Sequence, residues 1–483
     1  MVFRVRRKQP TAWRGLLPNH FGKAMFSPEP VSQLVPLPDS AAPKQKQPLF
    51  GPLLFHRHAT IVAAAVFLLA LSGPPRLRIR DPEASLRGDF DWVVILHLAV
   101  WGSAGLWVLW QIAKRFQAKR PLLRLRLPQI FALAMILGLA SSTWVSDAPL
   151  LTAFKVYQIL LSLLLTQIFM ERFGAWTSFK TMLWGNALLC IAIATCAFVL
   201  PDKVWTASEF NPEPSRLFGE LIAPTGVVSV LAIILLLTCV RKVWSFLPLA
   251  SLTLFLGLLA LSLMRTAYVV AFLFFALVIL RRPNIKPLRR FTYVLCMSLM
   301  LLYAWGRLPK VSQYRDPESV STLGDRIGLW RHLTAVTLNQ SPWFGLGYYS
   351  ASRIHGPEYN PGLGIAHSMF VEVLSGGGVL SFAPLIGLCV TLSVYVIRLL
   401  YRRRDRLSFA TSALFIACLL FGFAGEELDS GPVAMAFWFC AAVLPRLYEQ
   451  SFKQAPAVSR TSPELGKQRL TPQPALYAPP EAI

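Results

Sequence analysis

Residues 407–424 read LSFATSALFIACLLFGFA, a continuous apolar run without a charged side chain. A helix that crosses the hydrocarbon layer of a membrane needs about 20 largely apolar residues. Similar runs recur along the chain: apolar residues make up 54% of it and charged residues only 15%. Soluble globular proteins carry about 25% charged residues. The predicted fold class is therefore an all-α polytopic membrane protein.

We predict about twelve transmembrane helices, separated by short polar segments. They cover residues 58–73, 92–113, 129–146, 149–170, 178–200, 219–240, 244–263, 266–280, 291–306, 367–397, 407–424 and 432–446. Spans of about 17–25 residues are usual, so the first, eighth and ninth stretches are short. The one long segment between spans is 307–366, which makes it the natural place for a functional site.

Basic residues gather on one side of these spans. The chain has 48 Lys and Arg and 24 Asp and Glu, for a formal net charge of +24. Of the basic residues, 34 fall in segments on the side of the N-terminus and 13 on the other side. Cytoplasmic loops of membrane proteins are enriched in Lys and Arg, which places both termini in the cytoplasm and segment 307–366 in the periplasm. The basic charge then reports topology and attraction to anionic lipids, and nucleic-acid binding is excluded.

The predicted organisation has three parts. Residues 1–57 form a basic, Pro-rich cytoplasmic tail, 58–447 the transmembrane domain, and 448–483 a second cytoplasmic tail. Both tails are expected to be disordered because they are rich in proline and lack long apolar runs. All seven cysteines fall within predicted spans, which excludes a disulfide framework and a cysteine-based zinc site.

Four side chains that can carry positive charge lie at the periplasmic boundary. Arg216 precedes the sixth span, Arg265 separates the seventh from the eighth, and His367 opens the tenth, while Arg326 lies in the long outer segment. Arginine is well shaped to bind phosphate through two N–H groups, and histidine can accept a proton from a sugar hydroxyl near neutral pH. Singly, each could be a solvated or interfacial residue. Together they favour an anionic, lipid-linked substrate.

The outer segment also predicts a short helix and a tight turn. Thr322 and Asp325 have capping-box spacing, so a helix should follow, with Arg326 one turn before Trp330. Such an amphipathic helix would lie on the membrane surface. Its predicted apolar face comprises Ile327, Trp330, Leu333 and Thr337. The turn is predicted at Gly345 and Gly347, within SPWFGLG.

Ionisable residues within or beside spans suggest further roles. Glu372, five residues after His367, could orient the imidazole or pair with an arginine. Lys155 could reach the interface with its long side chain. Asp89 and Asp91 could bind a divalent metal. Acidic residues are also expected at the first turn of a helix, where they favour its dipole, and we adopt that interpretation and predict no metal site.

These motifs resemble, in order and spacing, the O-antigen ligase and Wzy-type polymerase superfamily of bacterial inner-membrane glycosyltransferases. The resemblance covers residues 141–387 and begins around LASSTWVSDAP at 139–149. Further motifs are RLFG at 216–219, LMRTA at 263–267, DRIGLW at 325–330, SPWFGLG at 341–347, AHSMF at 366–370 and the glycine pair at 377–378. Three positions depart from the family pattern: Thr225 replaces asparagine, Met264 replaces serine, and Ser368 replaces the commoner asparagine.

The resemblance implies transfer of a glycan from an undecaprenyl-diphosphate carrier to a hydroxyl acceptor on the periplasmic side of the inner membrane. It implies that His367 is the general base or orients the acceptor, that Arg265 and Arg326 hold the diphosphate, and that Arg216 assists. Glu372 and Trp330 would contribute to substrate binding. Direct displacement would invert the anomeric carbon, and neither a nucleotide sugar, a metal nor another cofactor is implied.

Several alternatives stay open at the level of sequence. A polymerase would join O-antigen or exopolysaccharide repeat units, whereas a ligase would pass the glycan to lipid A core, and we favour the polymerase. Partners would be the lipid-linked oligosaccharide, the acceptor, membrane lipids and accessory proteins such as a flippase and a chain-length regulator. A lipid-linked glycan flippase would need charges lining several spans. A metal-dependent glycosyltransferase would use Asp89 and Asp91.

Overall fold

The computed structural model describes most of the predicted transmembrane domain. The described residues are 92–119, 125–206, 216–217, 224–240, 245–281, 291, 293–298, 302, 306, 326–360, 365–403, 405–425 and 428–453. The two predicted tails up to residue 57 and beyond 453, the first predicted span and the Asp89 and Asp91 pair lie outside them.

Helices dominate the described residues. In chain order they are α3 (Trp92–Gln117), α4 (Leu127–Ser141), α5 (Pro149–Phe173), α6 (Ala175–Val199), α7 (Pro201–Val204), α8 (Thr225–Cys239), α9 (Phe246–Ser262), α10 (Arg265–Arg281), α13 (Arg326–Gln340), α14 (Ser350–Tyr359), α15 (Met369–Arg402), α16 (Arg406–Ala424) and α17 (Gly431–Lys453). A 3₁₀ turn, η1 (Ser142–Trp144), follows α4. Strands β1 (Trp205–Thr206) and β2 (Arg216–Leu217) form a small antiparallel pair.

Within the described residues, 7 helices are long and apolar enough to cross a membrane. They are α3, α4 with η1, α5, α6, α15, α16 and α17, and each coincides with a predicted span. Helices α8 and α9 are apolar but shorter. Helix α17 extends to Lys453, past residue 447, where the transmembrane domain is predicted to end.

Contacts between helix ends fix the direction of each helix in the bundle. Arg406, at the start of α16, donates to the Thr238 carbonyl near the end of α8 at 2.8 Å. Arg281, at the end of α10, donates to the Arg403 carbonyl just before α16 at 3.3 Å. Helices α8 and α10 therefore run opposite to α16, and their first residues lie at the end where α16 finishes.

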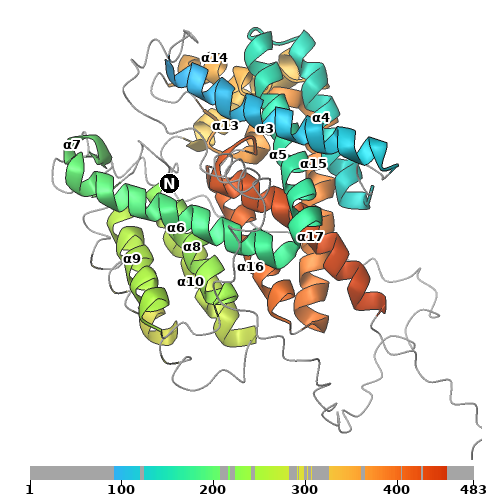
Figure 1. The fold of residues 1–483 in the computed structure, drawn as a ribbon. Coiled ribbons are helices and arrows are strands. Elements are labelled where there is room, and N and C mark those ends of the chain that lie inside the picture. Colours follow the sequence, from blue (N-terminus) through green and yellow to red (C-terminus); the bar gives the residue numbers. More distant parts are fainter. Residues whose placement is uncertain are drawn as a thin grey trace, which may run out of the picture. The chain divides into compact units, whose positions relative to one another are not determined.

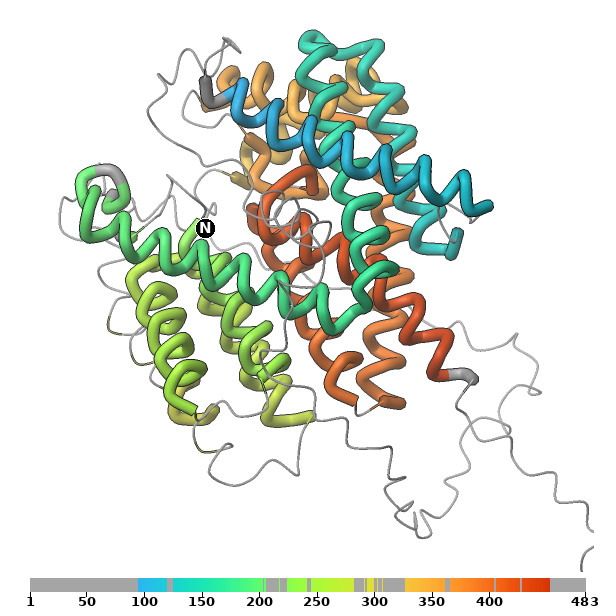
Figure 2. Tube along the Cα trace, viewed as in Figure 1, coloured from blue at the N-terminus to red at the C-terminus, as the bar shows by residue number. Residues whose placement is uncertain are grey.

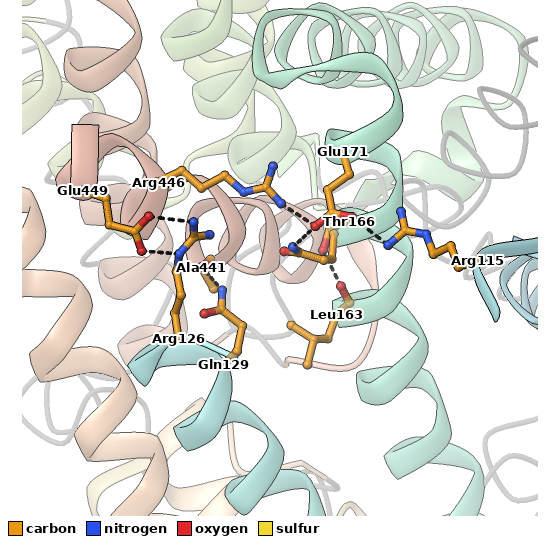
Figure 3. A network of polar contacts seen from close by, with 10 residues as sticks. Arg115, Arg126, Gln129, Leu163, Thr166, Glu171, Ala441, Arg446 and Glu449 are labelled. Carbon is orange, nitrogen blue, oxygen red and sulfur yellow. Dashed lines mark hydrogen bonds and ion pairs between the residues drawn. The ribbon is translucent and has the colours of Figure 1, made fainter. Parts of the chain in front are cut away.

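We call that end, which also holds the first residues of α15, the His367 end. The opposite end is the Glu171 end, named for a carboxylate that joins three helices (Figure 3). Glu171 of α5 accepts from Arg115 of α3 at 2.7 Å and from Arg446 of α17 at 2.6 Å. Beside it, Arg126 before α4 pairs with Glu449 of α17. These pairs hold four helices in register.

The packed core is built around α8. All but the last of its residues are buried, and it lies against α6, α9, α10 and α16 (Figures 1 and 2). This explains why its sequence is apolar on every face rather than along one stripe. Helices in lipid associate by close packing, which small residues permit. A Cβ atom at Gly138 of α4 would lie 2.9 Å from the Leu380 carbonyl oxygen of α15, so these two helices meet with almost no space between backbones.

Helix α15 is broken inside its first half. Gly378 has φ 60° and ψ −161°, values that a side chain would strain. The loop after α13 docks against this break through main-chain hydrogen bonds. Leu346 N–H donates to the Ser375 carbonyl at 2.8 Å, and Val379 N–H donates to the Pro342 carbonyl at 2.9 Å. The break thus exposes backbone groups that the loop satisfies, as non-helical backbone within a membrane requires.

The turn predicted at Gly345 and Gly347 is confirmed, since both residues have positive φ, 70° and 99°. The sequence did not predict where this turn lies in the fold. The turn packs against α15 and is not a free outer loop, since a Cβ at Gly345 would lie 2.5 Å from the Gly376 carbonyl carbon. The loop thereby positions α14 beside the start of α15.

Candidate functional site

His367 lies in the turn that leads into α15. Its φ is 52°, in the left-handed region that non-glycine residues seldom adopt. Such strained residues persist only where their surroundings hold them, and they cluster at functional sites. The side chain is partly exposed. The histidine singled out by the sequence therefore sits in the unfavourable backbone geometry that a site residue often shows.

The peptide groups of Ala366 are held on both sides. The Trp330 indole N–H of α13 donates to the Ala366 carbonyl at 2.7 Å, and the Ala366 N–H donates to Glu372 Oε2 at 3.3 Å. The other carboxylate oxygen of Glu372 accepts from the Ser352 hydroxyl of α14 at 3.0 Å. Glu372 is 1% exposed. Trp330 and Glu372 thus contact the turn's backbone, whereas the sequence had suggested contact with substrate.

Arg326 reaches the same turn from the start of α13. Its Nη1 donates to the Ala424 carbonyl, the last residue of α16, at 2.5 Å. A Cβ atom at Gly425 would lie 3.8 Å from Arg326 Nη1 and 4.0 Å from the His367 carbonyl oxygen. Arg326 and His367 are therefore neighbours: the distance from Arg326 Nη1 to the His367 carbonyl oxygen is no more than the sum of these two distances. A carbonyl satisfies one of the five N–H donors of an arginine.

The predicted apolar face of α13 is confirmed in part. Leu333 and Thr337 are buried, while Ile327 and Trp330 are partly buried. Leu329 is buried as well, although the sequence interpretation did not include it. The Trp330 ring packs edge-on against Phe423 of α16 at a centroid distance of 5.8 Å. This packing against α16, rather than a membrane surface alone, holds Arg326 at the end of that helix.

Arg265 is the first residue of α10, so it lies at the His367 end of the bundle. A short break with a left-handed Leu263, φ 49°, separates α9 from α10. The start of α8 packs against this break: a Cβ at Gly226 would lie 2.9 Å from Met264 Cβ. Helix α10 in turn packs on α16, whose end contacts Arg326. The two arginines predicted to hold phosphate thus both lie at the His367 end, on helices that each contact α16.

Arg216 lies in strand β2, where its backbone pairs with Thr206 of β1. This strand pair follows α6 and precedes α8, and β2 contacts α9. The described structure fixes the Arg216 backbone only. It belongs to the loop that connects two helices at the His367 end.

A second polar cluster lies between α5 and the segment before α17. Lys155 of α5 forms an ion pair with Asp429, whose exposed fraction is 0%. The Lys155 ammonium also lies 3.8 Å from the centroid of the Tyr349 ring, and the Arg353 guanidinium lies 4.7 Å from the same ring. The Ser162 hydroxyl donates to the Asp429 carbonyl at 3.1 Å. Lys155 is therefore held inside the bundle instead of reaching the interface.

The sequence missed the residues that complete these contacts. Asp429 and Ser352 belong to no motif, and their pairing with Lys155 and Glu372 depends on helix packing over long separations in sequence. The sequence did not mark Gly425 either, because its importance comes from the residues that the fold places beside it.

In the part of the chain that the structure describes, no group of three or more His, Cys, Asp and Glu side chains is placed to hold a metal ion.

Comparison with known proteins adds no assignment: no protein-family model matches the chain, and no curated protein matches it. The resemblance seen in the sequence therefore rests on the motifs alone, and the site has to be judged by its geometry.

Proposed function

We propose that the chain transfers a glycan from an undecaprenyl-diphosphate-linked donor to a hydroxyl acceptor, at the His367 end of the bundle. The observation that carries this proposal is the neighbourhood of Arg326 and His367 around Gly425. One residue there can bind phosphate and the other can accept a proton, and Arg265 opens a helix at the same end.

The chemistry follows from these residue types. The acceptor hydroxyl gives its proton to the His367 imidazole, and its oxygen forms a bond to the anomeric carbon of the donor glycan. The bond from that carbon to the diphosphate oxygen breaks, and the electron pair leaves with undecaprenyl diphosphate. Arg265 and Arg326 stabilise the negative charge that develops on the diphosphate, an effect that is strong where water is scarce. Because the attack is direct, the anomeric configuration inverts.

The proposal includes a topology. About twelve spans, with both termini in the cytoplasm of the bacterial inner membrane, would put the His367 end in the periplasm. The bias of Lys and Arg supports this orientation, since 34 of the 48 fall on the opposite side. The lipid-linked donor would then approach from the outer leaflet, where the carrier presents its glycan.

Polymerisation of O-antigen or exopolysaccharide repeat units is the reaction we favour, and ligation to lipid A core is the alternative. Both use the same donor and the same leaving group, so the site chemistry described above applies to either. They differ in the acceptor, which is a second carrier-linked glycan for a polymerase and lipid A core for a ligase. A flippase and a chain-length regulator are proposed partners.

The test is the length distribution of the host's surface polysaccharide on a gel. A strain lacking the gene is complemented with wild type, His367→Ala or Arg265→Ala at matched protein amounts. We expect both variants to lose product by about 100-fold or more, because each removes a group that acts in the transition state. Normal polysaccharide from both variants would reject the proposed function.

The same gel separates the two reactions. Single repeat units on the acceptor in the variants indicate that polymerisation has stopped. Full-length chains that stay on undecaprenyl diphosphate indicate that ligation has stopped. Glu358→Gln serves as the control variant, since Glu358 of α14 is half exposed and pairs with His355 at 3.1 Å. It should leave the pattern unchanged.

A further inference from the structure

The turn before α15 combines a strained residue with a backbone held from two sides. Ala366 is 0% exposed, and both of its peptide groups bind buried or partly buried side chains from different elements. Trp330 comes from α13 and Glu372 from the first turn of α15. Next in sequence is His367, whose φ of 52° would relax if the preceding peptide could rotate.

We propose that Glu372 and Trp330 are positioning residues that form a clamp on the two peptide groups of Ala366 and so fix the direction of His367. This inference rests on the proposed function, because it assigns the clamp a purpose in that reaction. The clamp consists of Ala366 with the peptide groups on either side of it, the Trp330 indole and the Glu372 carboxylate.

The burial of Glu372 supports a fixed role in the protein. A carboxylate that is 1% exposed needs hydrogen-bond partners, and those the structure describes are the Ala366 N–H and the Ser352 hydroxyl. The first bond joins Glu372 to the turn before α15, and the second joins Glu372 to α14. Glu372 therefore links the helix that follows the docked loop to the residue before His367.

Trp330 acts on the other peptide group of Ala366, the one that joins Ala366 to His367. Its indole N–H is its one donor, and it is used on the Ala366 carbonyl at 2.7 Å. The ring is wedged against Phe423 of α16, so the donor has a fixed position. Since Arg326 is four residues earlier on α13, one helix places both the clamp and the guanidinium next to His367.

The clamp predicts a specific change in amide hydrogen exchange of the purified full-length protein. In Glu372→Ala and in Trp330→Phe, the amides of residues 366–368 should exchange at least tenfold faster than in wild type. The amides within α16 should be unaffected. Glu372→Gln keeps one amide oxygen as an acceptor and should lie close to wild type, as should the control Glu358→Gln.

Surface polysaccharide from the same variants tests the positioning role. Glu372→Ala and Trp330→Phe should each lower product by tenfold or more at matched protein amounts, and Glu372→Gln should restore most of it. If exchange at 366–368 is unchanged in both variants, the clamp is wrong. If exchange rises in both but only Glu372→Ala loses product, Glu372 does not act through the turn. If His367→Ala itself makes normal polysaccharide, the proposed function and the positioning role fail together, while the exchange data still decide whether the clamp exists.

Discussion

The two ends of the helix bundle use charged residues in different ways. At the Glu171 end, arginines contact carboxylates: Glu171 bridges Arg115 and Arg446, and Arg126 pairs with Glu449. At the His367 end, Arg326 donates to a backbone carbonyl, and the carboxylate pairs that the structure describes there involve lysine and histidine. The buried carboxylate there, Glu372, accepts from an N–H and a hydroxyl.

The two ends also differ in backbone conformation. In the described part of the chain, the non-glycine residues with positive φ are Lys119, Leu263, Tyr349 and His367. Lys119 follows α3 at the Glu171 end, and the other three lie at the His367 end. Strain of this kind costs on the order of 1–3 kcal/mol per residue. One end thus fastens regular helices together, while the other holds turns with strained backbone.

The strongest test of this difference between the two ends is to replace one arginine at each end. Arg326→Ala should lower the rate of polysaccharide formation by about 10²–10³, because it removes a donor to the leaving group. Arg446→Ala should leave the rate per folded molecule unchanged and lower stability instead. Product from pulse-labelled cells, normalised to folded protein, measures both. Equal losses of rate in the two variants would show that the ends do not differ in this way.

The Lys155–Asp429 pair lies at the His367 end and includes a buried carboxylate, so it tests whether a carboxylate contact at this end is structural. Lys155→Met would leave the buried Asp429 carboxylate without its cation, which should lower the free energy of unfolding by about 3 kcal/mol. The double variant Lys155→Met/Asp429→Asn should recover most of that loss. Denaturant unfolding in detergent gives both values. A double variant as unstable as the single one would mean that the pair is not the source of the effect.

Two glycines compare backbone strain at the two ends. Gly378→Ala places a Cβ 2.4 Å from the Trp343 carbonyl carbon in a conformation with φ 60°. We expect it to displace the docked loop and to lower stability by about 3 kcal/mol. Gly174, between α5 and α6, also has positive φ, but nothing lies within 4 Å of an added Cβ.

Gly174→Ala should therefore cost about 1 kcal/mol, from backbone strain alone. The midpoint of thermal unfolding compares the two variants, and amide exchange over residues 342–348 shows whether the loop has left α15. If Gly174→Ala proves as harmful as Gly378→Ala, close contact with the loop is not what makes Gly378 necessary.

The smallest effect is expected for Glu171→Gln. The substitution keeps the shape but removes the charge shared with Arg115 and Arg446, and it replaces one of the two acceptor oxygens with an NH2 group. Both contacts are partly exposed, so the loss of stability should be about 1 kcal/mol and should shrink at high salt. Thermal unfolding at two salt concentrations measures it. A large, salt-independent loss would indicate that the carboxylate does more than tie these helices.

The sequence predicted what depends on local composition. Apolar runs such as 407–424 placed the helices, and the glycines at 345 and 347 placed a turn. It also singled out Arg326 and His367, which the fold brings together. The contacts of Trp330 and Glu372 with Ala366 could not be predicted, because they form only once α13 has packed against the start of α15. Likewise, no sequence pattern marks the Asp429 partner of Lys155.

Binding of undecaprenyl diphosphate to the purified full-length protein tests the central claim most directly, because it probes the His367 end without requiring the glycan. Wild type, Arg326→Ala, Arg265→Ala and the control Arg446→Ala are compared by native mass spectrometry in detergent. We predict that the two variants at the His367 end bind at least tenfold more weakly than wild type, and that Arg446→Ala binds as wild type does. Equal binding by all four proteins, or none by wild type, would contradict a diphosphate site at the His367 end.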